Sequence, residues 1–181
     1  SRKAGGSIPL ESQLELAHAV WNLERTAKNY RSQAIRIELP GGKCCYPDFV
    51  VLTYDGVYEV HEVKPDILHL DDDTIRKLKV VERIFNSIGI PFKIIDSSTL
   101  PSMRQAEDLL LIYARGHVQH WTAYQIELAI NLLQTNFISK LSDGHHFLLA
   151  HDLPAQLLEY LIFHELVSLP SLQQSNFGKG V

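Results

Sequence analysis

Three side chains suited to phosphate or metal chemistry lie at the ends of two neighbouring apolar segments. Asp48 opens the first segment, and Glu62 and Lys64 close the second. Both segments are rich in Val, Tyr and Phe, and the Asp55-Gly56 pair between them is typical of a β-hairpin turn. Because side chains alternate along a strand, Glu62 and Lys64 point to the same face.

The length of the turn decides whether Asp48 lies on that face. A two-residue turn would put Asp48 opposite Val63. A three-residue turn that includes Tyr54 would put it opposite Glu62, with Gly56 in the left-handed conformation that such a loop requires. The second register gathers two carboxylates and an ammonium. Buried carboxylates repel each other, so this register predicts a divalent metal between them.

A simpler interpretation stays open at this point. Strand ends often carry acids and lysines, so the same residues would suit a surface hairpin with an ordinary Glu–Lys ladder.

Composition limits the number of domains and the class of protein. The chain has 181 residues, 45% of them hydrophobic, enough for the core of one domain or two small ones. No apolar run approaches the about 18 residues that a membrane span needs. Cys44 and Cys45 are adjacent and are expected to be reduced strand residues in a cytosolic protein.

The net charge of −4 argues against a strong free-standing nucleic-acid binder. Residues 1–100 contain 13 Lys and Arg against 14 Asp and Glu, whereas residues 101–181 contain 4 against 7. Most cations therefore lie in the half of the chain that carries the hairpin.

The sequence predicts the order of the helices and strands around the hairpin. Periodicity and turn residues predict, in sequence, helix 9–27, strand 29–37, a turn at 40–43 into the strand before the Asp-Gly turn, helix 74–87 and strand 91–96. Asp72 or Asp73 should cap the second helix. A strand–helix–strand unit of this length should be a right-handed crossover, with its two strands parallel.

This order resembles the PD-(D/E)xK nucleases, with Pro47-Asp48 followed after a hairpin by Glu62-Val63-Lys64. Further motifs resemble the TnsA-type transposon-end endonucleases: Ser12-Gln-Leu-Glu15, the segment 29–37 with Ala34 where that family usually has Pro, and Glu-Val-Lys-Pro followed by a helix and Gly89-Ile-Pro-Phe.

The resemblance implies a fold and a domain plan. We expect an α/β, restriction-endonuclease-like core with a mixed β-sheet, and a small, mainly helical, winged-helix-like C-terminal domain. The expected boundaries are a flexible arm 1–8, a nuclease domain 9–100, the C-terminal domain 101–170 and a flexible tail 171–181.

The resemblance also implies a metal site. Asp48, Glu62, the Val63 carbonyl and Glu15 from the first helix would hold one or two Mg²⁺, for which Mn²⁺ would substitute. Lys64 would orient the attacking water or stabilise charge on the phosphate. The neighbouring Glu11 is expected to be an ordinary surface residue.

The activity implied is metal-dependent DNA cleavage at the 5′ ends of a transposon during cut-and-paste transposition. The implied partners are double-stranded transposon ends, a DDE transposase (TnsB-type) and an AAA+ ATPase regulator (TnsC-type) that binds the C-terminal domain or tail. The implied compartment is the bacterial cytoplasm, at the nucleoid.

The C-terminal region supports docking of protein rather than DNA. Its expected helix 153–163 offers Gln156 and Glu159 among leucines, without the Lys, Arg or Asn that read bases. A strand is expected at 165–169. Thr122 and Gln125 form a capping box that should begin a helix reaching Gln134.

Two alternative functions stay open. The first is a free-standing nuclease on the same core, such as a junction resolvase or restriction enzyme. The second is a non-catalytic adaptor that retains the nuclease fold.

Overall fold

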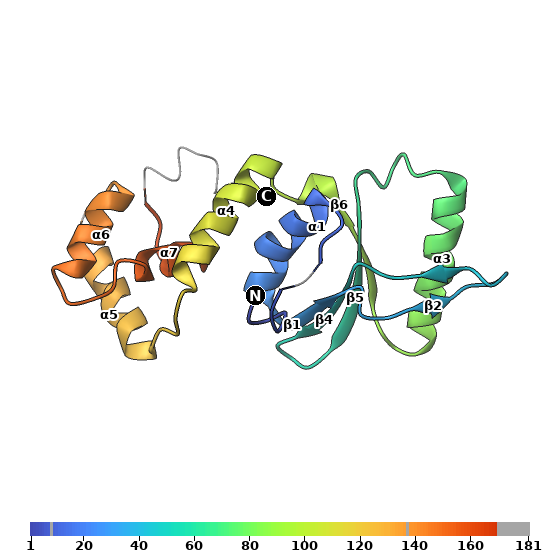
Figure 1. The fold of residues 1–181 in the computed structure, drawn as a ribbon, viewed down its shortest axis with the longest axis horizontal. Helices are drawn as coiled ribbons and strands as arrows, with labels where there is room; N and C mark the ends of the chain where they lie inside the picture. The colour runs from blue at the N-terminus through green and yellow to red at the C-terminus, as the bar shows by residue number, and fades with distance from the viewer. Residues whose placement is uncertain (8, 137, 170–181) are drawn as a thin grey trace. The chain divides into compact units, whose positions relative to one another are not determined.

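A computed structural model describes residues 1–7, 9–136 and 138–169 of the chain (Figure 1). The chain divides into two compact units, Ser1–Ala106 and Glu107–Val181. The division falls within helix α4 (Met103–Gly116) rather than after residue 100. The expected tail, 171–181, lies outside the described residues.

The first unit contains a four-stranded sheet in the order β1-β4-β5-β6. Its strands are β1 (Ala27–Ser32), β4 (Phe49–Thr53), β5 (Tyr58–Lys64) and β6 (Phe92–Asp96). The first three pair antiparallel, and β6 pairs parallel to β5. Helix α3 (Asp72–Ser87) connects the parallel pair, so the expected mixed α/β sheet is confirmed.

Each face of this sheet packs against a different helix. Phe49 and Val63 lie in a buried cluster with Leu23, which ends the π-helical turn η1 (Ala19–Leu23). Val60 lies on the opposite face of β5, in a cluster with Phe85 of α3. Side chains alternate between the two faces along β5, so Glu62 and Lys64 share the face of Val60. That face is the one that packs against α3.

The first helical segment begins later than the predicted residue 9. It consists of α1 (Gln13–His18), a π-helical turn η1 (Ala19–Leu23) and α2 (Glu24–Thr26). Ser12 sets the start because its hydroxyl accepts a hydrogen bond from the Glu15 N–H. The prediction was also wrong by one residue at α3, where Asp71 is the N-cap and accepts from the Thr74 N–H at 2.8 Å.

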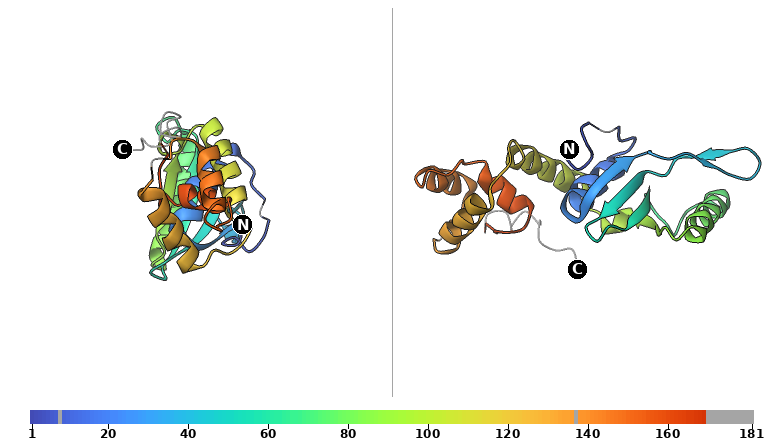
Figure 2. Two further views of the ribbon diagram at one scale, coloured as in Figure 1. Left: turned by 90° about the vertical axis from the view of Figure 1, so that its left-hand side faces the viewer. Right: turned by 90° about the horizontal axis from the view of Figure 1, so that it is seen from below.

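The prediction of one long strand over 29–37 was wrong. Strand β1 ends at Ser32, and Gln33 follows with a positive φ of 45°. The next residues form a separate hairpin of β2 (Ile37–Glu38) and β3 (Cys44–Cys45). This hairpin projects beyond the main sheet beside α3 (Figures 1 and 2).

The second unit is helical in its described part. It contains the remainder of α4, α5 (Ala123–Gln134), α6 (Leu141–Leu149) and α7 (Leu157–Phe163). The capping box of Thr122 and Gln125 is confirmed. Helix α6 was not predicted.

The prediction of a strand at 165–169 was wrong. Glu165 has a φ of 57°, and the Leu166 N–H donates to the Leu161 carbonyl, so these residues close the end of α7. Within residues 107–136 and 138–169 no strand is present, and the described chain therefore shows no wing.

Residues 1–7, which we expected to form an arm, contact the sheet. Ala4 is buried in the cluster with Tyr30, and the Tyr30 N–H donates to the Lys3 carbonyl at 3.2 Å. The helices described are all too short or too polar to cross a membrane.

Candidate metal site

The register of the central hairpin places Asp48 opposite Glu62. Phe49 pairs with His61, and the Thr53 N–H donates to the Val57 carbonyl at 2.9 Å, which closes a three-residue turn. Gly56 has a φ of 87° in this turn, a conformation that suits glycine. Of the two registers that the sequence allowed, the structure therefore has the one that brings the two acids together.

Asp48 is held at the end of β4 by backbone groups. Its Oδ2 accepts a hydrogen bond from the Val63 N–H at 2.6 Å, and its carbonyl accepts from the Gln33 N–H at 2.9 Å. Burial, and to a smaller extent the charges of Glu62 and Glu15, raises the pKa of Asp48 to about 6. The carboxylate is thus oriented by the backbone in surroundings that disfavour its negative charge.

Glu62 has one satisfied and one unsatisfied carboxylate oxygen. The side chain is buried, and its Oε1 accepts a hydrogen bond from Lys64 Nζ at 2.8 Å. Its Oε2 is buried and receives no hydrogen bond among the described residues. A buried carboxylate oxygen without a donor is unfavourable, so a cation at this oxygen would lower the free energy of the site.

Glu15 lies near this pair but is engaged in capping its own helix. Ser12 Oγ donates to Glu15 Oε1 at 2.9 Å, and the Glu11 N–H donates to Oε2 at 3.0 Å. Its charge is close enough to raise the pKa of Asp48, as a smaller contribution than burial. Within the described chain, no hydrogen bond joins it to Asp48 or to Glu62.

The four predicted metal ligands therefore differ in their fit to a metal. Asp48 and Glu62 fit, because each carboxylate would be stabilised by a cation. The pKa of Asp48 is raised, and Glu62 has a buried oxygen that receives no hydrogen bond among the described residues. Glu15 would have to share oxygens that already cap α1. Val63, whose carbonyl we expected as a ligand, contacts Asp48 through its N–H. Among the described residues, no three His, Cys, Asp or Glu side chains are grouped closely enough to hold a metal.

The opposite face of β5 carries a buried polar chain that the sequence analysis missed. His18 Nε2 lies 3.0 Å from His61 Nδ1, and His61 Nε2 lies 3.1 Å from Glu59 Oε2. Asn22 Nδ2 lies 3.0 Å from His18 Nδ1. Lys93 Nζ donates to both Glu59 oxygens, at 2.8 and 2.7 Å.

The Glu59 carboxylate at one end of this polar chain fixes the direction of its hydrogen bonds. A carboxylate only accepts, so His61 donates from Nε2 and its Nδ1 accepts from His18 Nε2–H. His18 Nδ1 then accepts from the Asn22 amide. Burial, followed by the charge of His61, lowers the pKa of His18 to about 3, and burial lowers the pKa of His61 as well. Both imidazoles are neutral at neutral pH, and every ring nitrogen is satisfied.

Helix α1 and strand β5 are joined by this chain one turn after Glu15 and one residue before Glu62. A sequence signal existed in principle, because His18 and His61 are polar residues in otherwise apolar patterns. The pairing itself joins residues 43 positions apart and could not be derived from local spacing.

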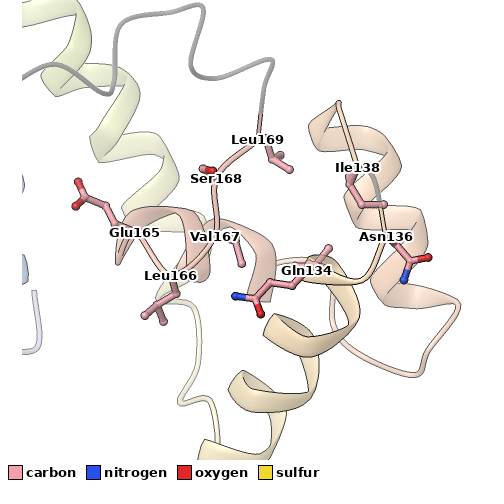
Figure 3. A pocket seen from close by; sticks show the side chains of 9 residues that line it. Gln134, Asn136, Ile138, Glu165, Leu166, Val167, Ser168 and Leu169 are labelled. Carbon is pink, nitrogen blue, oxygen red and sulfur yellow. The ribbon is translucent and has the colours of Figure 1, made fainter.

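A pocket of about 370 Å³ lies in the C-terminal unit, between the segment that follows α7 and the end of α5 (Figure 3). Its described lining includes Leu133, Val167 and Leu169 with the amides of Gln134 and Asn136. Glu165 contributes a carboxylate, and no Lys or Arg is among these lining residues. Such a lining does not suit a phosphate.

No protein-family model matches this chain, and no curated protein matches it significantly. The structure by itself defines a mixed α/β unit whose central hairpin brings together two acids and a lysine, followed by a helical unit.

Proposed function

We propose that this protein is a metal-dependent DNA endonuclease with a PD-(D/E)xK core, of the type that cleaves the 5′ ends of a transposon. One observation supports the proposal above all. Asp48 and Glu62 lie opposite each other beside Lys64, and a Glu62 oxygen is buried without a donor among the described residues. The order helix, antiparallel meander, helix and parallel strand also supports such a core.

Asp48 and Glu62 would hold Mg²⁺, and Glu15 would reach it only through a change in its capping bonds. When bound, Mg²⁺ would supply charge to polarise the phosphate and acidify a water. The Val63 N–H fixes one Asp48 oxygen and leaves the other available. Lys64 now neutralises Glu62, and its ammonium lies on the face where a phosphate would bind, so it can stabilise charge there.

The partner assignment extends this proposal. A transposase would deliver the DNA end, and an ATPase regulator would dock on residues after Pro101. The charge distribution supports it, because residues 101–181 carry 4 Lys and Arg against 7 Asp and Glu and do not favour DNA on their own.

Cleavage under conditions that do not depend on tight binding tests the activity. We expect the protein, in excess over a labelled duplex at low ionic strength, to nick the duplex with Mg²⁺ or Mn²⁺ and not with EDTA. Asp48→Asn and Glu62→Gln should each lose this cleavage, because each removes a charge that the metal needs. Lys64→Ala should lose turnover while retaining metal binding.

Glu82→Gln is the matched control, since Glu82 is an exposed acid on α3 and is absent from the site. Cleavage that survives in both Asp48→Asn and Glu62→Gln would contradict the assignment of the site. Rapid multiple turnover by the protein alone at physiological salt would favour a free-standing nuclease instead.

A further inference from the structure

A groove of about 430 Å³ lies between the β2–β3 hairpin and α3. The hairpin wall includes Leu39 and Lys43, and the helix wall includes Arg76, Lys77 and Val80. Both walls therefore contribute cations, and apolar side chains lie between them. Figure 2 shows the hairpin extending past the sheet, next to α3.

The charge of this groove is opposite to that of the chain. Three of its lining residues are cationic and one, Asp73, is acidic, whereas the whole chain carries −4. Arg76 lies 3.6 Å from Asp73, but both side chains are largely exposed and their attraction is screened. Lys43 forms no ion pair among the described residues. These cations are thus available to an external anion.

The groove lies on the same side of the sheet as the candidate metal site. Lys77 of the groove, Glu62 and Lys64 all lie within electrostatic range of Cys45. Cys45 packs in the same cluster as Val60, which shares its face of β5 with Glu62. The groove, the acids and Lys64 therefore all belong to the α3 side of the sheet.

We propose that this groove binds the phosphodiester backbone of a DNA strand next to the bond to be cleaved. The inference rests on the proposed function, because it names where that same site holds its substrate. A DNA backbone fits both features of the groove: it presents regularly spaced negative charges to two cationic walls, and it carries apolar sugar faces between its phosphates. Each Lys or Arg that contacts a phosphate releases counterions, so binding should weaken steeply with salt.

The salt dependence of binding tests the groove without any cleavage. A labelled duplex is titrated with the full chain in EDTA, by fluorescence anisotropy, between about 20 and about 200 mM salt. Lys43→Gln with Arg76→Gln should weaken binding several-fold at low salt. The slope of log affinity against log salt should become shallower by about 1 for each cation–phosphate pair that the substitutions remove. Arg76→Lys should keep the wild-type slope.

Lys79→Gln with Arg83→Gln is the matched control, because both residues are exposed cations of α3 outside the groove and the charge change is the same. The control should keep the wild-type slope. Equal losses in the test and control pairs, or no loss in either, would overturn the proposal, as would a wild-type protein that binds no duplex at low salt.

The binding and cleavage assays together distinguish failure of the groove proposal from failure of the nuclease proposal. If the groove variants lose binding while the wild type cleaves nothing under any metal condition, the groove stands and the nuclease proposal fails. If the groove variants bind normally while cleavage still depends on Asp48, the nuclease proposal stands and the groove fails.

Discussion

Asp48 lies where a carboxylate is unfavourable, and the backbone nevertheless holds it there. The Val63 N–H and Gln33 N–H both bond to this residue, while burial raises its pKa to about 6 from an ordinary value of 3.8. An ionised Asp48 therefore lowers the stability of the fold at neutral pH. A destabilising carboxylate at this position favours a functional role for Asp48 over a role in packing alone.

We predict that Asp48→Asn raises the melting temperature of the metal-free protein at neutral pH. The pKa of Asp48 is higher in the folded than in the unfolded state, so the folded chain binds more protons and stability falls as pH rises from about 4 to about 6. The amide group that Asp48→Asn introduces does not ionise, so the stability of the variant should lack this dependence on pH. Thermal melts in EDTA should show an advantage of the variant that is small near pH 4 and largest above about pH 6.

Adding Mg²⁺ should reverse the order of the two proteins, because the cation stabilises only the carboxylate form. A variant that is less stable than the wild type by the same amount at acid and neutral pH would contradict the raised pKa.

At the scale of elements, helix α1 and strand β5 are held together by the neutral pair His18 and His61. We predict that His18→Ala lowers the free energy of unfolding by roughly 1–3 kcal/mol, because it leaves the buried His61 Nδ1 unpaired; the half-buried Asn22 amide, which also loses its partner, should add less. His18→Gln should recover most of this loss, because its amide can donate to His61 Nδ1. Urea unfolding near neutral pH measures both.

If alanine and glutamine at position 18 destabilise equally, the hydrogen bond to His61 contributes little, and shape alone explains the contact. A cleavage rate that falls with His18→Ala and returns with His18→Gln would add that the pair also positions the acids next to it.

The sequence allowed the central hairpin to be predicted because its information is local. An Asp-Gly turn and a fixed side-chain period restrict the register to two choices, and the structure has the one that pairs Asp48 with Glu62. The parallel pairing of β6 with β5 followed from the length and helical content of the connection between them, which is typical of a crossover. These predictions needed no knowledge of distant contacts.

Other elements depend on tertiary contacts and were missed. Helix α6 contains Gly144, which weakens a local helix signal. In the fold, a Cβ at this position would lie 2.5 Å from Leu158 Cδ2, so a larger residue would require the buried Leu158 side chain to shift. Glu15 shows a related limit, because a Ser-x-x-Glu pattern serves both a ligand motif and a helix cap.

At the scale of the whole molecule, the distribution of charge limits what the protein can do alone. The groove beside α3 offers a few cations, while residues 101–181 are net acidic. A tight DNA-binding protein neutralises many phosphates. The proposed groove would therefore hold a DNA strand only locally, and residues 101–181, with 4 Lys and Arg against 7 Asp and Glu, would add little attraction for a duplex.

We predict that the isolated protein binds duplex DNA weakly at physiological salt and nicks it slowly or not at all. A transposase that delivers the DNA end, with a regulator bound to residues after Pro101, should raise the cleavage rate strongly. Gel-shift and cleavage assays, first with the protein alone and then with partners added, measure this dependence. Nanomolar binding by the protein alone would contradict it.

Titration calorimetry with Mn²⁺ is the sharpest test of the metal site, because it needs neither DNA nor partners. We predict that the wild type and Glu82→Gln bind the ion, that Asp48→Asn and Glu62→Gln lose this binding, and that Lys64→Ala retains it. Undiminished Mn²⁺ binding in both Asp48→Asn and Glu62→Gln, or no binding by the wild type, would contradict a metal site between the two carboxylates.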